Sequence, residues 1–267
     1  ALSHSYFFLA DYHAKKDKAL SEKCYLEANK LIADMQRDSI FTRQKYAKKI
    51  FTFFKEHQNF NHIEEKISKD KGEGLIFIFG MPRSGTTLTE SILSTADNIK
   101  AGGEKVFFSL QLHQIIEALP NNSLFSDEKF YQDLGDRYLQ NIEIQREGKK
   151  FFIDKLPENY LFYKFIRLSL PAAKFIHCYR DPWDNAISLF KQNYSINIFY
   201  ASSFFGIATE YANYESLIKT WRNLDGEGAF LDIEYEKMVN QKPEYIKKLW
   251  EFCQLEGRYN EESRKKH

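Results

Sequence analysis

Five consecutive β-prone apolar residues, Leu75 to Phe79, run directly into a loop bounded by Gly80 and Gly85, and a helical pattern begins at once after the loop. A continuous apolar run of this length is typical of a strand buried on both faces of a parallel sheet. A strand, a tight loop and a helix N-terminus together can hold a phosphate group, because backbone N–H groups and the helix dipole point at the anion. This segment therefore predicts an α/β fold with an anion site at the end of a central strand.

The apolar pattern changes near the glycines at positions 72 and 74. Residues 5–70 contain no Pro or Gly and have apolar residues three and four apart, which predicts helices. After residue 74, strand-like and helical stretches alternate, which indicates a parallel sheet flanked by helices. We therefore expect an all-helical extension over residues 1–72 and an α/β domain over residues 73–267. Further strands are expected at Phe151–Ile153, Lys174–Tyr179 and Ala229–Ile233.

Composition narrows the class of protein. The hydrophobic fraction of 43% and the charged fraction of 28% are ordinary for a globular protein. The net charge of +1 argues against a dedicated nucleic-acid binder. No run approaches the roughly 20 apolar residues of a membrane span. The three Cys residues are widely spaced, so we expect no disulfide framework, no metal site and a reducing, cytoplasmic compartment.

The loop differs from the Walker A motif of NTPases although its glycine spacing fits. Thr86 stands where that motif has its Lys, so the usual partner of a γ-phosphate is missing. Arg83 is the only cation inside the loop, and Ser84, Thr86 and Thr87 add hydroxyl donors. The loop is therefore suited to a phosphate but not to ATP hydrolysis.

A second anion-binding segment is indicated 97 residues after Arg83, where Arg180 follows the expected strand Lys174–Tyr179. An Arg at a strand end can clamp a phosphate with two N–H groups. Ser188 stands eight residues after Arg180, two helical turns on, and would donate a hydroxyl to the same group. Alone, the Arg-Asp-Pro sequence would indicate only a salt-bridged helix start. Together with the first loop, it indicates a second phosphate subsite.

Both segments resemble those of sulfotransferases that use 3′-phosphoadenosine 5′-phosphosulfate (PAPS). Residues 82–88 are similar to the family's 5′-phosphosulfate loop, and residues 175–189 are similar to its 3′-phosphate segment. The similarity extends over residues 74–253 and is greatest to the branch with protein-tyrosine sulfotransferases and bacterial tetratricopeptide-repeat (TPR) sulfotransferases. It implies a P-loop-type central parallel sheet flanked by helices. It also implies in-line sulfuryl transfer from PAPS to an acceptor hydroxyl, without a metal, leaving adenosine 3′,5′-bisphosphate (PAP).

The resemblance also assigns roles to individual residues. Glu104 matches the catalytic base, and Lys155 and Arg83 match the cations that stabilise the transferring sulfuryl group. Tyr235 matches a position near the nucleotide. The residues implied to hold the 5′-phosphosulfate are Arg83, Ser84, Gly85, Thr86, Thr87 and Leu88, and those implied to hold the 3′-phosphate are Arg180 and Ser188.

Each of these assignments has a plainer alternative. Glu104 can be an exposed turn residue, and Tyr235 can be ordinary packing at a strand end. Asp154 can pair with Lys155 as a structural bridge. Glu90 is a weaker rival for the base, because we expect it to face away from the cleft.

The N-terminal and C-terminal segments of the chain each show a feature that bears on the family resemblance. Four residues stand where a TPR unit carries Tyr, a small residue, an aromatic residue and Ala, although Leu9 departs from that pattern; they are Tyr12, Ser21, Tyr25 and Ala28. This stretch is either the last unit of an array or a helical cap on the next domain. The family's loop that closes over the nucleotide is expected to be lacking at the C-terminal end, or the basic tail there is its stub. Residues 264–266 are expected to be a solvated basic tail.

Two rival functions remain open on the sequence. One is a P-loop kinase of a small alcohol or nucleoside, which the missing Walker Lys disfavours. The other is a helical-repeat scaffold with an inactive transferase fold. For a sulfotransferase, the acceptor is a small molecule, a sugar or a protein tyrosine. The chain begins with Ala rather than Met, so a Golgi location is the alternative if an upstream anchor is missing.

Overall fold

The computed structural model describes residues 2–35, 37–119, 123–194, 198–257 and 259. The expected basic tail at residues 264–266 lies outside this set. The chain forms two compact units. Unit 1 comprises residues 1–48 and 181–215, and unit 2 comprises residues 49–180 and 216–267. The domain boundary expected at residue 72 stays a prediction.

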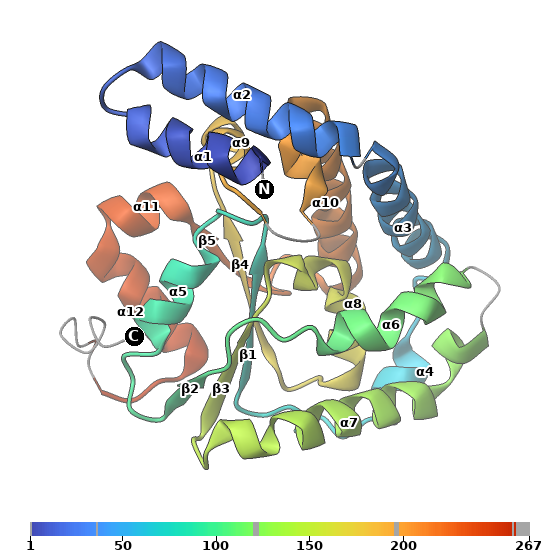
Figure 1. The fold of residues 1–267 in the computed structure, drawn as a ribbon. Helices are drawn as coiled ribbons and strands as arrows, with labels where there is room; N and C mark the ends of the chain where they lie inside the picture. The colour runs from blue at the N-terminus through green and yellow to red at the C-terminus, as the bar shows by residue number, and fades with distance from the viewer. Residues whose placement is uncertain (1, 36, 120–122, 195–197, 258, 260–267) are drawn as a thin grey trace. The chain divides into compact units, whose positions relative to one another are not determined.

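Unit 2 contains a five-stranded sheet in which every pairing is parallel (Figure 1). The strands lie in the order β2 (Ile99–Ala101), β3 (Phe151–Lys155), β1 (Leu75–Gly80), β4 (Lys174–Tyr179) and β5 (Leu231–Glu234). All residues of the central strand β1 are buried, as its apolar run predicted. The predicted α/β class with a central parallel sheet is therefore confirmed.

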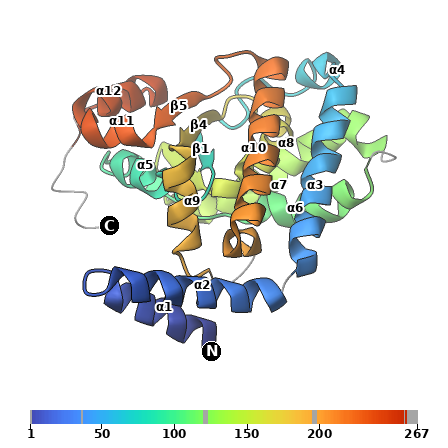
Figure 2. The same ribbon diagram turned by 90° about the horizontal axis from the view of Figure 1, so that it is seen from above.

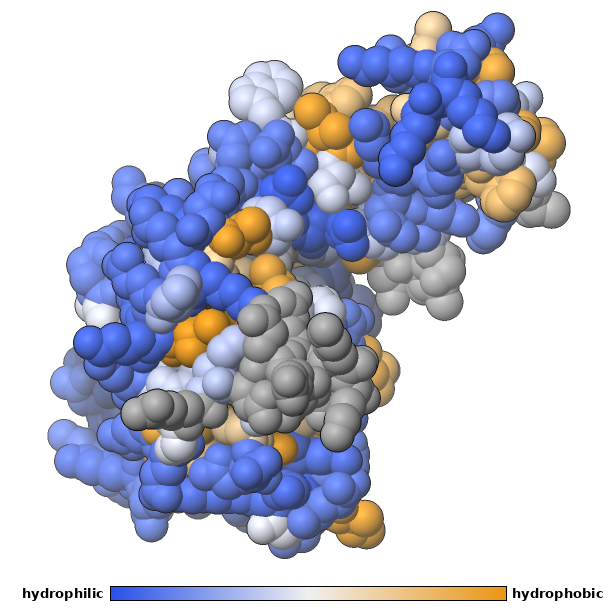
Figure 3. All heavy atoms as spheres, turned by 90° about the vertical axis from the view of Figure 1, so that its left-hand side faces the viewer, coloured by the Kyte–Doolittle hydropathy of each residue, from blue (hydrophilic) through white to orange (hydrophobic). Residues whose placement is uncertain are grey.

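One face of the sheet carries aliphatic side chains, which share a buried cluster with α5 (Thr86–Leu93), α11 (Tyr235–Asn240) and α12 (Lys242–Cys253) (Figure 1). Ile76 and Ile78 of β1 belong to the same cluster as Leu249 of α12. Helix α12 buries Tyr245, Leu249 and Trp250 on one side and exposes charged residues on the other. In Figure 3, which views this side of the molecule, hydrophilic surface surrounds small separate hydrophobic patches.

The opposite face of the sheet is aromatic. Because side chains alternate along a strand, Phe77 and Phe79 point away from the aliphatic cluster. The Phe77 ring centroid lies 5.5 Å from that of Phe175 on β4 and 5.6 Å from that of Tyr138. The Phe79 ring lies 6.0 Å from Tyr163. The helices on this side are α6 (Phe107–Glu117), α7 (Glu128–Arg146) and α8 (Tyr163–Ser169).

Unit 1 consists of helices. It contains α1 (Leu2–His13), α2 (Lys18–Met35), α9 (Pro182–Phe190) and the first parts of α3 (Arg37–Glu56) and α10 (Phe204–Asp225). Helices α1 and α2 pack along each other (Figure 2), and the Ser21 hydroxyl donates to the Ala10 carbonyl at 2.7 Å. The Asn29 amide on α2 donates to the Phe190 carbonyl at the end of α9, at 2.8 Å. The TPR assignment of α1 and α2 stays a prediction.

The strands expected at residues 151–153, 174–179 and 229–233 correspond to β3, β4 and β5, with ends that agree within two residues. The 3₁₀ turn η2 (Pro157–Leu161) precedes α8. Strand β2 and helix α11 were not expected. No helix in the described part of the chain has the length and apolar character needed to cross a bilayer.

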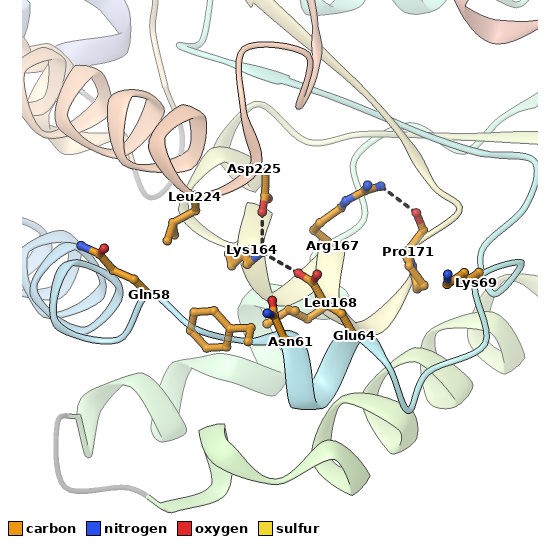
Figure 4. Close-up of a pocket in the computed structure, with 11 residues that line it drawn as sticks. Gln58, Asn61, Glu64, Lys69, Lys164, Arg167, Leu168, Pro171, Leu224 and Asp225 are labelled. Carbon is orange, nitrogen blue, oxygen red and sulfur yellow. Dashed lines mark hydrogen bonds and ion pairs between the residues drawn. The ribbon is translucent and has the colours of Figure 1, made fainter.

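A buried ion-pair cluster ties three segments of unit 2 together on α8 (Figure 4). Lys164 has a side chain only 3% exposed, and its ammonium lies 3.1 Å from a Glu64 oxygen of α4 (Asn61–Glu64). It also contacts Asp225 at the end of α10. The cluster lines a cavity of about 500 Å³. A buried Lys is tolerated at this position because two carboxylates offset the cost of burying its charge.

Replacing Lys164 by Met should destabilise unit 2 by about 3–5 kcal/mol, because Asp225 would remain buried without its cation. Urea denaturation of the two proteins measures the difference. The control is Lys247→Met, which removes an exposed 3.7 Å ion pair with Glu251 and should change stability by less than about 1 kcal/mol. An equal effect of both substitutions would contradict this account of the cluster.

Candidate active site

Five separate segments meet at one edge of the sheet, because the carboxyl ends of parallel strands lie together. Glu104 follows β2, and Lys155 is the last residue of β3. The loop that begins at Gly80 follows β1, and Arg180 follows β4. Tyr235 comes directly after β5. The strand order therefore gives the order of these groups along the edge, with neighbours about 4.8 Å apart at the strand level.

Close packing defines the loop after β1. A Cβ atom on Gly80 would lie 2.0 Å from the carbonyl oxygen of Cys178, and one on Gly85 would lie 2.7 Å from the Tyr235 ring. Gly85 also has a φ of +98°, which favours glycine. Arg83, with φ of +71°, is the non-glycine residue of the loop held in the left-handed region. Backbone strain of this kind is concentrated at functional sites, and the Arg83 side chain is exposed.

The loop presents hydrogen-bond donors at the start of α5. Gly85 caps this helix without a side-chain hydrogen bond, so the first backbone N–H groups have no intrahelical acceptor. The Ser84 hydroxyl is buried and has no hydrogen-bond partner among the described residues. Thr86 is buried and Thr87 is exposed. An anion bound here would receive backbone and hydroxyl hydrogen bonds together with the favourable helix dipole.

Lys155 and Glu104 form an ion pair beside this loop. The Lys155 ammonium lies 2.7 Å from a Glu104 oxygen. The Lys155 side chain is 8% exposed, whereas that of Glu104 is 55% exposed. The carboxylate is therefore open to a substrate, while the cation that orients it is held from inside the protein.

The alternative ion pair between Asp154 and Lys155 is wrong. Successive residues of β3 point to opposite faces, and Asp154 accepts hydrogen bonds from Tyr138 at 2.8 Å and Asn159 at 3.2 Å. Burial raises the pKa of Asp154 to about 7, although these donors and the Lys105 backbone N–H favour the ionised form. This buried group supports the backbone next to Glu104.

Arg180 lies against an aromatic ring at the end of β4. Its guanidinium carbon is 4.6 Å from the centre of the Tyr235 ring, and its Nε lies 3.6 Å from an oxygen of Glu236. Tyr235 starts α11 rather than continuing a strand, and its ring also packs beside Gly85. Tyr235 therefore joins the two expected phosphate segments of unit 2.

Ser188 lies in unit 1, on α9. Asp181 begins this helix by accepting from the N–H groups of Trp183 and Asp184, at 2.9 and 3.0 Å. This is the capping contact that an Asp-Pro sequence favours. The assignment of Ser188 to the 3′-phosphate rests on the sequence.

Glu90 does not face away from the site, contrary to the sequence expectation. Its Oε1 accepts a hydrogen bond from the Gly103 N–H at 3.1 Å, directly before Glu104. Burial raises the pKa of Glu90, an effect that the positive charge of Lys155 partly offsets. A signal was present in the sequence, because Glu90 lies four residues after Thr86 and so shares its helix face.

The comparisons with known proteins show the family of the chain. Residues 76–261 match a family model described as "Sulfotransferase family". The chain therefore belongs to the sulfotransferase family. Within the residues that the structure describes, no group of three or more His, Cys, Asp or Glu side chains is arranged to hold a metal ion.

Individual relatives are more distant. The chain is 30% identical over 209 residues to an "Uncharacterized protein" of Aquifex aeolicus (strain VF5). The aligned region covers 72% of this chain and 27% of that protein. It is 25% identical over 188 residues to a "Putative protein-tyrosine sulfotransferase" of Caenorhabditis briggsae, covering 69% and 66% of the two chains. The chain thus spans about a quarter and just under two thirds of these relatives. The sulfotransferase domain of the curacin biosynthetic pathway aligns at 16% identity with a TM-score of 0.48, covering 69% and 75%.

The stability of the protein should depend on the titration of Asp154. Its folded pKa of about 7 lies above its ordinary value of 3.8, so the folded state holds an extra proton between these values and loses stability as the pH rises through this window. Asp154→Asn removes this titration. The variant should therefore gain up to about 4 kcal/mol relative to the unsubstituted protein between pH 4 and pH 7.

Urea denaturation of both proteins at several pH values measures this difference. Asp97→Asn, at an exposed position, is the control. A stability difference between Asp154→Asn and the unsubstituted protein that stays constant from pH 4 to pH 7.5 would show that Asp154 does not titrate as described.

Proposed function

We propose that this chain transfers a sulfuryl group from PAPS to an acceptor hydroxyl and releases PAP. The observation that carries the proposal is the order of groups along the sheet edge. From β2 to β4 the edge presents a carboxylate, a buried cation, an anion-binding loop and an Arg. In the proposal, the carboxylate faces the acceptor hydroxyl and the cation faces the sulfuryl group. The loop then faces the 5′-phosphate, and the Arg faces the 3′-phosphate.

The residues after β1 fit the 5′-phosphosulfate of the donor. The open N–H groups at the start of α5 and the partnerless Ser84 hydroxyl suit an oxygen-rich anion. Arg83, Ser84, Gly85, Thr86, Thr87 and Leu88 hold this group in the proposal. In the proposal, Arg180 holds the 3′-phosphate, and Tyr235 packs against both Arg180 and Gly85. The role of Ser188 at the same phosphate is proposed from the sequence alone.

The chemical step needs a base and a cation. Glu104 takes the proton of the acceptor hydroxyl, and the acceptor oxygen bonds to sulfur while the bond from sulfur to the 5′-phosphate oxygen breaks. Lys155 and Arg83 stabilise the negative charge that develops on the sulfuryl group and the leaving oxygen. Because β3 lies between β2 and β1, Lys155 stands between the base and the loop.

The acceptor in this proposal is a hydroxyl compound, and a protein tyrosine is the first to examine. The Caenorhabditis briggsae relative is named as a protein-tyrosine sulfotransferase. The exposed position of Glu104 leaves room for a bulky acceptor such as a peptide. A sugar and a small alcohol are the other acceptor classes to screen.

PAP should stabilise the protein without metal, and ADP should not. Thermal unfolding with PAP at about 100 times its Kd should show about 2.7 kcal/mol of added stability. Arg180→Ala should remove most of this effect. Arg137→Ala is the control, because Arg137 is exposed on α7 and donates to Gln111. Equal stabilisation by ADP, especially with Mg²⁺, would favour a kinase, and no effect of either nucleotide would favour a scaffold.

Glu104→Gln should lower kcat by about 10²–10⁴-fold, because the amide cannot accept the acceptor proton. The Kd for PAP should change by less than about threefold, because the substitution lies outside the phosphate subsites. Transfer of labelled sulfuryl groups from PAPS to a tyrosine peptide measures kcat. Glu73→Gln, at an exposed turn before β1, is the control. Turnover of Glu104→Gln close to that of the control would exclude Glu104 as the base.

A further inference from the structure

Glu90 is a carboxylate that the proposed chemistry does not use. It lies on α5, one helical turn after Thr86, and is half-buried. Its pKa is raised by burial, so an ionised Glu is costly at this position. The cost is offset by the Gly103 N–H at 3.1 Å and by the nearby charge of Lys155. An apolar residue at this position would avoid the cost of burying a charge, but it would not accept the hydrogen bond from the Gly103 N–H.

Hydrogen bonds hold the backbone on both sides of Glu104. The Gly102 N–H donates to the Ile153 carbonyl at 2.8 Å, and the Lys155 N–H donates to the Gly103 carbonyl at 2.9 Å. Asp154 accepts from the Lys105 N–H. These three contacts come from β3 or its neighbours, and the contact from Glu90 comes from the phosphate-loop helix.

Gly103 is the residue of this segment with the greatest conformational freedom. It has a φ of +66°, and no atom lies within 4 Å of the position that its Cβ would take. Packing therefore does not hold Gly103, so hydrogen bonds must fix its peptide group. The Glu104 side chain is largely exposed, and its orientation depends on the backbone that precedes it.

We infer that Glu90 is a positioning residue that joins the donor-binding helix to the catalytic base. By accepting the Gly103 N–H, it holds the peptide between Gly102 and Gly103, one residue before Glu104, at a fixed distance from the start of α5. The base is thereby aligned with a donor bound at the same helix, and misplacement of a catalytic group by about 1 Å can cost about 100-fold in rate. This inference rests on the proposed function.

The test compares three variants on the same helix. Glu90→Gln keeps an oxygen that accepts the Gly103 N–H, whereas Glu90→Ala removes it. Ser91→Ala is the matched control, because the Ser91 hydroxyl donates within the helix, to the Leu88 carbonyl at 2.9 Å. We expect kcat to fall by about tenfold or more in Glu90→Ala and to stay within about threefold in Glu90→Gln and in the control. The Kd for PAP should stay within about twofold in all three.

Hydrogen exchange of the Gly103 amide gives a second readout that needs no substrate. Exchange should be about tenfold faster in Glu90→Ala than in the unsubstituted protein and unchanged in Glu90→Gln. Normal turnover and normal exchange in Glu90→Ala would overturn the inference. Equal loss in both Glu90 variants would also overturn it, because charge rather than the hydrogen bond would then matter.

A failure of the proposed function would be distinguishable from a failure of this inference. If the unsubstituted protein shows no sulfuryl transfer, the proposed function fails, and slow Gly103 exchange that depends on Glu90 would support only the link between the helix and the loop. If the protein is active and Glu90→Ala is as active, only the inference fails.

Discussion

The parallel pairing of β1 with β3 on one side and with β4 on the other is the constraint on which the candidate site depends. The register sets Ile78 opposite Lys155 and Gly80 opposite Cys178. Backbone hydrogen bonds fix this register, so the residue that follows each strand has little freedom to move along the edge. Segments separated by scores of residues in the chain thereby bring Glu104, Lys155, Arg180 and the loop after β1 to the same edge of the sheet.

Close packing at this edge has an electrostatic consequence. The loop after β1 is so near its neighbours that side chains at Gly80 and Gly85 would collide with them. Burial also raises the pKa of two carboxyl groups near this edge, those of Asp154 and Glu90. Each of these groups accepts a backbone N–H beside Glu104. The supporting hydrogen bonds are therefore strong because they lie in a region of low dielectric constant.

The fold class and the main strands were predictable because they depend on local pattern. The apolar run at residues 75–79 and the segment at residues 174–179 are typical of buried strands, and both are strands in the structure. Strand β2 was missed because it is only three residues long and has Lys100 at its centre. Helix α11 was missed because it is only six residues long and follows β5 directly.

The sequence by itself determined the chemical types of the candidate side chains. It also gave the strand ends for the loop after β1, for Lys155 and for Arg180, because each of them follows an apolar run that predicts a strand. It did not determine which side chains pair. The ion pair of Lys155 with Glu104, rather than with Asp154, follows from strand alternation and from the pairing of β2 beside β3. The contact of Glu90 with the Gly103 N–H was decided only by tertiary structure. This contact joins α5, which precedes β2 in the chain, to the loop that follows β2. No local sequence rule specifies the distance between the Glu90 carboxylate and the Gly103 N–H.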